Sequence, residues 1–264
     1  MAVDLTAVFE DWKLDREDES KNIRCLRGRD GRLKIQVRVR CGIFQWEFEG
    51  RPDGTTPYGA RSLLDYYRAQ LGAGRGRRGG RAAFRLSKAQ VEELSEEIMD
   101  YYQRRMLFFR LGEYERARDD AQHNLGLMDL IRDYSDDPEA IAQHEKWRAF
   151  VLMDCARAEA LTLCQNGACL DAMRTLDEGI ARVADLFRKQ GHPEAIPISQ
   201  ELAALKELKL QLREAYNIPL SREEILDGLR EEQAKAIADE DYERAARLRD
   251  EIAQFEKDEG QRAV

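Results

Sequence analysis

Histidine, cysteine and proline are scarce in this chain, and no apolar run is long. It has 3 His, 5 Cys and 6 Pro among 264 residues. So little Pro excludes a collagen-like or Pro-rich chain, and so little Cys argues against a disulfide-stabilised scaffold. No apolar run approaches the roughly 20 residues of a membrane-spanning helix. The acidic first residues lack a basic stretch followed by an apolar one, so they do not resemble a secretory signal. We therefore expect a soluble, cytoplasmic protein.

Charge is abundant but unevenly distributed. Charged residues make up 36% of the chain, a fraction that suits long helices with solvated outer faces. The net charge of −8 combines +5 over residues 1–83 with −13 over the remainder. A basic front and an acidic back predict separate surfaces for separate partners. Compositional drift between domains would produce the same asymmetry.

Alternating apolar and polar residues predict a small antiparallel sheet near the N-terminus. The alternation runs over 32–41 and resumes over 43–49, which is typical of half-buried strands. Asp30-Gly31 is a hairpin signal that connects the first of these strands to a strand near 22–27. Gly42 marks either a tight turn or a bulge. We therefore expect three antiparallel strands.

The fold class is predicted to be mainly α, with this sheet in a small N-terminal α+β domain, residues 1–71. Residues 72–83 hold five Gly and four Arg, cannot build a core, and predict a flexible linker. Antiparallel helical hairpins over 84–216 and a C-terminal helical hairpin over 217–264 complete the chain. Capping and breaking residues place the helices at about 60–71, 87–110, 113–134, 137–165, 167–190, 196–216, 221–238 and 241–257.

Two of these helical pairs resemble the tetratricopeptide repeat. Gly112-x-Tyr114-x-x-Ala117 recurs 55 residues later as Gly167-x-Cys169-x-x-Ala172, although the family period is about 34 residues. In both copies a small residue lets the paired helices approach closely. The resemblance covers roughly residues 90–190 and implies tetratricopeptide-like pairing. A generic helical bundle would show the same Gly and Ala positions.

A second resemblance lies in the last two helices. The residues that carry it are Leu229, Ala236, Asp241, Tyr242, Glu243, Ala245, Ala246, Leu248, Arg249, Asp250 and Ile252. With them, residues 221–258 strongly resemble the UVR motif that the UvrB and UvrC excision-repair proteins share with some Clp ATPases and McsA-type regulators. In that family the module mediates protein–protein contacts, including the pairing of one hairpin with another.

The residues themselves agree with a docking role. A hairpin of about 37 residues is marginal on its own, so its apolar stripes need another surface. That surface is a protein partner, a second copy, or the chain's own helical body, which the hairpin would then cap. Arg249 and Asp250 follow Leu248, and at least one is expected to make a charged contact across the hairpin or to the partner. The predicted partner-binding residues are Leu229, Ala236, Tyr242, Ala245, Leu248, Arg249, Asp250, Ile252 and Phe255.

Catalytic, cofactor and metal sites are not predicted. The sequence has no phosphate-binding GxxxxGK[ST] loop, no Cys-x-x-Cys pair and no Gly-x-Ser-x-Gly elbow. Cys164 and Cys169 are expected to be buried as small apolar residues, and Cys25 and Cys41 to face one core in the sheet. We therefore expect a bacterial adaptor that is not an enzyme and needs no cofactor.

Nucleic-acid binding is the alternative. Basic residues crowd the polar face of the first strands and the Gly-rich segment, and Phe44, Trp46 and Phe48 would offer stacking platforms. The alternation of these aromatics with polar residues favours the core side of the sheet instead. An acidic protein partner would also fit the basic face. Its residues are Lys34, Arg38, Arg40, Arg75, Arg77, Arg78 and Arg81.

Overall fold

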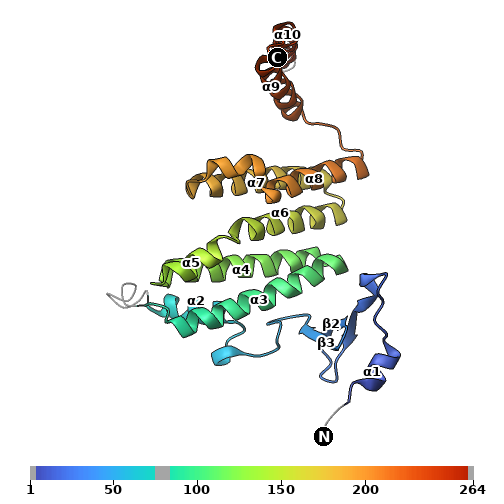
Figure 1. Ribbon diagram of the computed structural model, residues 1–264, viewed down its shortest axis with the longest axis vertical. Helices are drawn as coiled ribbons and strands as arrows, with labels where there is room; N and C mark the ends of the chain where they lie inside the picture. Colours follow the sequence, from blue (N-terminus) through green and yellow to red (C-terminus); the bar gives the residue numbers. More distant parts are fainter. Residues whose placement is uncertain (1–3, 75–83, 261–264) are drawn as a thin grey trace. The chain divides into compact units, whose positions relative to one another are not determined.

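The computed structural model describes residues 4–74 and 84–260. It is mainly helical with a three-stranded sheet near the N-terminus, which confirms the predicted fold class (Figure 1). The chain forms two compact units, the N-terminal unit (residues 1–211) and the C-terminal unit (residues 212–264). In chain order the elements are α1 (Thr6–Asp11), β1 (Ile23–Arg27), β2 (Leu33–Val39), β3 (Gly42–Glu47), α2 (Leu63–Gly74), α3 (Lys88–Leu111), α4 (Tyr114–Tyr134), α5 (Pro138–Glu145), α6 (Arg148–Gln165), α7 (Cys169–Lys189), α8 (Gln200–Ala215), α9 (Arg222–Ala238) and α10 (Tyr242–Gly260), with short 3₁₀ helices at Glu19–Asn22, Pro57–Gly59 and Pro193–Ile198.

The sheet has the order β1-β2-β3 and is antiparallel throughout. Gly31 has a φ of 76°, a backbone conformation that favours glycine, at the predicted hairpin turn. Gly42 pairs with Val39 across the second turn, so it marks a tight turn and not a bulge. The expectation that Cys25 and Cys41 face one core is wrong, because both are exposed. Cys41 lies in the turn itself, where its side chain has no sheet face to join.

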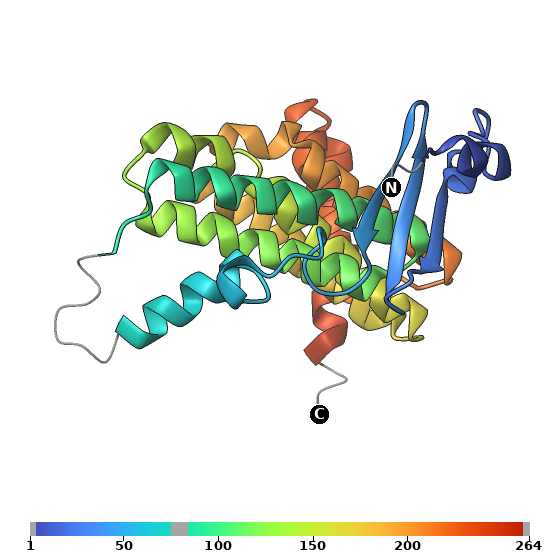
Figure 2. The same ribbon diagram turned by 90° about the horizontal axis from the view of Figure 1, so that it is seen from below.

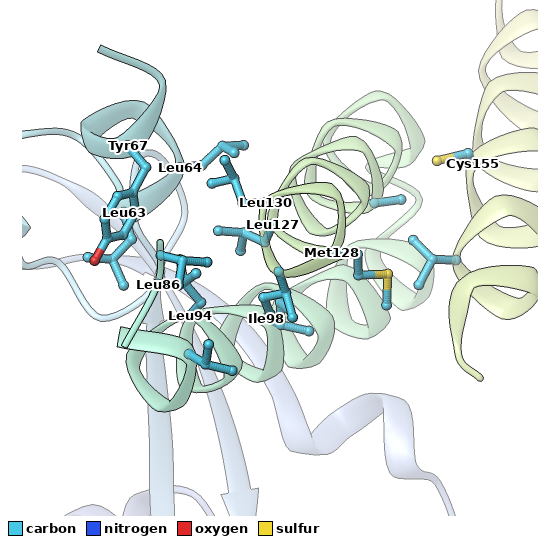
Figure 3. Close-up of a cluster of buried hydrophobic side chains, with 14 residues drawn as sticks. Leu63, Leu64, Tyr67, Leu86, Leu94, Ile98, Leu127, Met128, Leu130 and Cys155 are labelled. Carbon is cyan, nitrogen blue, oxygen red and sulfur yellow. The ribbon is translucent and has the colours of Figure 1, made fainter. Parts of the chain in front are cut away.

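The main core joins α2 to the helices that follow the Gly-rich segment. Leu63, Leu64 and Tyr67 of α2 pack with Leu94 of α3 and Leu127 of α4 in one buried cluster (Figure 3). The predicted domain boundary at 72–83 is therefore wrong, since the chain on both sides of it shares one core. The boundary between compact units lies near residue 211 instead. Residues 75–83, which hold most of the predicted linker, lie outside the described residues.

Helices α3, α4, α6 and α7 pack in sequence, each against the next. Gly112 and Gly167 end α3 and the turn after α6 with φ of 73° and 78°, as the break signals predict. Ala117 and Ala172 have no exposed surface, so the small residues of the two resembling copies lie at helix contacts. The antiparallel pairs are thus present, while their tetratricopeptide-like character stays a prediction.

One predicted helix is divided. The sequence predicts an uninterrupted helix over 137–165, but α5 ends at Glu145 and α6 begins at Arg148. No Gly or Pro marks the break. Arg148 is buried there, and its guanidinium pairs with Glu145 at 2.6 Å and with Asp129 of α4 at 2.9 Å. The contact with Asp129 is tertiary, so helix propensity alone cannot predict it.

The sheet lies beside the N-terminal helices (Figure 2), and buried charges attach it to them. Arg104 of α3 makes a two-pronged ion pair with Asp120 of α4, at 2.6 and 2.9 Å. Its remaining nitrogen donates to the carbonyl oxygens of Glu47 and Gly50, which flank the end of β3. Glu97 of α3 is fully buried and accepts a 2.9 Å hydrogen bond from the first backbone N–H of α2. The sheet and α2 are therefore held by named polar contacts as well as by apolar packing.

Candidate functional site

The C-terminal hairpin consists of α9, a three-residue turn and α10, which lie side by side (Figure 1). Ser221 and Glu224 start α9 with the predicted capping box, since each side chain accepts a hydrogen bond from the other's backbone N–H. Glu240 in the turn has a φ of 60°, which allows Asp241 N–H to reach the carbonyl oxygen of Ala236 at 2.8 Å. The Asp241 side chain then caps α10 by accepting from Arg244 N–H at 3.0 Å.

A narrow apolar seam holds the two helices together. Ala236, Ala245 and Leu248 are buried to 3, 7 and 8% exposure, with Leu229 packed partly against them. Gln233 adds a 3.4 Å hydrogen bond from its side-chain amide to the carbonyl oxygen of Ala245. Four predicted partner-binding residues therefore contact one another inside the hairpin. Their direct role is to hold its shape.

The far end of the seam is looser. Ile252 and Phe255 are only half-buried. The guanidinium of Arg222 lies 4.7 Å from the centre of the Phe255 ring and donates to the backbone carbonyl of the same residue. Apolar surface thus remains partly open along α10, where two helices alone cannot cover it.

Arg249 and Asp250 do not bridge the hairpin. They pair with each other at 2.8 Å, and their side chains are 69 and 71% exposed. Of the two expected charged contacts, the one across the hairpin is not made, and a contact to a partner stays a prediction. Because Leu248 points into the seam, the next two residues point away from it at 100° per residue. Among the described residues, the ion pairs that cross between α9 and α10 are instead Arg230–Glu256 at 2.8 Å and Arg244–Glu232 at 3.0 Å.

Two large apolar side chains project from the turn end of the hairpin. Ile237, in the last turn of α9, is 52% exposed, and Tyr242, the first residue of α10, is 68% exposed. We call them the exposed pair. Sequence reasoning identified Tyr242 but missed Ile237, which directly follows Ala236 and so lies off the apolar stripe. The signal for Ile237 in the sequence is a large apolar residue one position away from the apolar stripe of its helix.

The predicted basic face of the sheet is largely occupied within the chain. Lys34 is 7% exposed and pairs with Asp30 at 2.7 Å and with Glu47. Arg38 is also 7% exposed, and its guanidinium lies 3.8 Å from the centre of the Phe9 ring. Both were expected on an open polar face, and that placement is wrong because α1 folds over this face and acidic neighbours neutralise Lys34.

The remaining residues of that face have different positions. Arg40 is exposed in the turn after β2. Phe48 is buried against Phe108, Trp46 is half-buried, and Phe44 is 57% exposed. The aromatic residues thus do not form one stacking platform. Four further predicted members lie outside the described residues: Arg75, Arg77, Arg78 and Arg81.

Two further searches of the described parts of the chain bear on function. Within residues 4–74 and 84–260, no three His, Cys, Asp or Glu side chains gather closely enough to hold a metal ion. Across the same ranges, no helix combines the length and apolarity needed to cross a membrane.

Comparison with known proteins locates the hairpin in a family. A family model described as the UvrB/uvrC motif matches residues 223–258. This hairpin is a UVR motif. The match spans most of α9, the acidic turn and most of α10, so the seam and the exposed pair are both parts of the UVR hairpin. No curated protein and no solved structure matches the chain.

Proposed function

We propose that this chain is a non-enzymatic adaptor whose UVR hairpin docks a protein partner. The observation that carries the proposal is the exposed pair, Ile237 and Tyr242, which leaves two large apolar side chains uncovered at one end of a very small fold. Burial of such a side chain stabilises a complex by about 1.5–3 kcal/mol. Burial of both side chains against a partner would therefore supply a large part of the energy that anchors a docking helix.

The small seam supports the same conclusion. Among the hairpin's described side chains, only Ala236, Ala245 and Leu248 are buried. Units of fewer than about 40 residues usually need a partner, a metal or a cross-link for stability. A second hairpin packed on half-buried Ile252 and Phe255 would complete a four-helix arrangement.

Charge indicates what kind of partner fits. Residues 222–260 contain 14 Asp or Glu against 7 Lys or Arg. Two copies of so acidic a hairpin would repel each other, whereas a partner with Lys or Arg around an apolar stripe would be attracted. We therefore favour a UVR-type or other helical partner of opposite charge over self-pairing. Raised salt should weaken binding to a partner of opposite charge and strengthen self-pairing, because it screens both the attraction and the repulsion.

The structure of the sheet gives little support to the alternative that the chain binds nucleic acid. Lys34 and Arg38 already have partners within the chain. Arg40 and the four arginines of residues 72–83 are the residues on which that alternative now depends. If the chain binds nucleic acid, its affinity for DNA or RNA probes should fall steeply as the salt concentration rises.

Substitution of the exposed pair tests the proposal. We expect Ile237→Glu with Tyr242→Glu to weaken docking about 100-fold, because two apolar anchors become charges facing a partner surface. Sedimentation velocity of the full chain, alone and mixed with a purified UVR-motif protein, measures this. The matched control is Leu170→Glu with Ile198→Glu, which changes two apolar residues that are 66 and 80% exposed in the N-terminal unit. Equal affinity of the test and control variants would contradict the proposal.

A further inference from the structure

A pocket of about 420 Å³ opens among α3, α4, α5 and α6 in the N-terminal unit. This volume lies within the range of small-molecule sites. Ile98, Met128 and Val151 line it with apolar surface. Met99 and Trp147 also line it, and they are unusually open, at 51 and 55% exposure. Trp147 belongs to the break between α5 and α6, so the division of that helix helps to form the pocket.

The charges that line this pocket have one sign. Arg105 and Lys146 contribute to the lining, and no Asp or Glu is among its described lining residues. A pocket with cationic and apolar lining favours a molecule that combines an anionic group with an apolar body.

Arg105 is the most unusual of these residues because it is fully buried with donors left over. Its Nε lies 2.9 Å from Oδ2 of Asp154, which is also fully buried. No nitrogen of this guanidinium and neither carboxylate oxygen of Asp154 makes a hydrogen bond to a described residue, although Nε and Oδ2 are close enough for an ion pair. Nearly all buried polar groups in proteins have such a partner. A guanidinium fork with free donors matches the two oxygens of a carboxylate or sulfonate.

Aromatic rings surround the same guanidinium. The Tyr102 and Phe150 rings lie 5.3 and 5.9 Å from it, and both rings line the pocket. Because Arg105 has no exposed surface, an anion reaches it only after one of these half-buried rings shifts. The rings would then flank the ligand's apolar body, beside Trp147 at the rim.

We propose that this pocket binds a small amphipathic anion, with an aromatic or aliphatic body and one carboxylate or sulfonate. The body packs on Trp147 and Phe150, and the anionic group lies toward Lys146 and Arg105. The site belongs to the N-terminal unit, so it stands whether or not the UVR hairpin docks a partner.

A pair of fluorescent probes tests this with the full chain. 8-Anilinonaphthalene-1-sulfonate and N-phenyl-1-naphthylamine share one ring system, and only the first carries a sulfonate. We expect saturable binding of one sulfonate probe per chain, with a Kd at least tenfold below that of the neutral probe. Lys146→Gln should weaken sulfonate binding about threefold and leave neutral binding unchanged. Lys206→Gln, the same change at an exposed site on α8, should alter neither.

Two further variants keep the test decisive. Trp147→Ala should weaken both probes, and Arg105→Met with Asp154→Leu should bring the two affinities together without leaving a buried charge unpaired. Near-ultraviolet circular dichroism checks that each variant is folded. If the double variant does not fold, the Lys146→Gln and Trp147→Ala variants, which change exposed residues, still test the proposal. Equal affinity of both probes for the native chain would overturn the proposal and favour an uncharged side chain as occupant. Sulfonate binding lost only in the Ile237→Glu, Tyr242→Glu variant would overturn it by assigning the probe to the hairpin.

Discussion

Leu248→Asp is expected to unfold the UVR hairpin and to leave the N-terminal unit folded. Leu248 is 8% exposed in a seam with only two other buried residues, Ala236 and Ala245. A carboxylate placed there has no partner in the seam, and the burial of an unpaired charge costs several kcal/mol. A two-helix unit of this size has no such reserve of stability. Residues 1–211 have their own core and should not respond.

Amide hydrogen exchange measures both halves of that prediction at once. Protection should vanish over 222–256 and persist over 88–189. Ala246→Asp is the matched control, because it makes the same kind of change at an exposed position of the same helix. Loss of protection in both units, or in neither, would contradict a separately folded hairpin.

Arg105→Met alone is expected to destabilise the N-terminal unit by about 3–5 kcal/mol, because it leaves Asp154 buried without its cation. Arg105 and Asp154 both have essentially no exposed surface. Burial already raises the pKa of Asp154 to about 6, against the opposing charge of Arg105. The double variant Arg105→Met with Asp154→Leu should recover most of the lost free energy of unfolding, because an apolar pair leaves no buried charge without a partner.

The same pair predicts a dependence on pH with a definite sign. A carboxyl whose folded pKa lies above its unfolded value contributes stability below pH 4 that is lost as pH rises through about 6. At pH 5 the carboxyl of Asp154 is already mostly protonated, so the loss of Arg105 leaves little buried charge behind, whereas at pH 7.5 it leaves a carboxylate without its cation. The cost of Arg105→Met should therefore be about 1 kcal/mol smaller at pH 5 than at pH 7.5. Urea unfolding at the two pH values measures it, and an equal cost at both would contradict a buried carboxylate.

Local chemistry made much of the fold predictable. The capping boxes at Ser87 and Ser221 and the turns at Gly112 and Gly167 depend on a few adjacent residues, and all four occur as expected. The UVR hairpin was recognisable for the same reason, because its seam and its turn lie within one short segment.

Contacts between distant segments explain the rest. Lys34 and Arg38 alternate with apolar residues as solvent-facing residues do, and only the fold of α1 over the sheet buries Arg38. Arg104 and Arg105 look like ordinary charged helix residues until Asp120 and Asp154 meet them. The apolar stripe of the UVR hairpin predicts a docking surface, although its centre is the contact between α9 and α10. Periodicity identifies a buried face but not what buries it.

Hydrogen exchange of the complex with a UVR-motif protein tests the central claim most directly. If the hairpin docks the partner, amides of α9 and α10 should gain protection on complex formation, most strongly around Ile237 and Tyr242. Amides of α3, α4, α6 and α7 should exchange as in the free chain. Protection gained along these four helices, with α9 and α10 unchanged, would contradict the account and assign docking to the N-terminal unit.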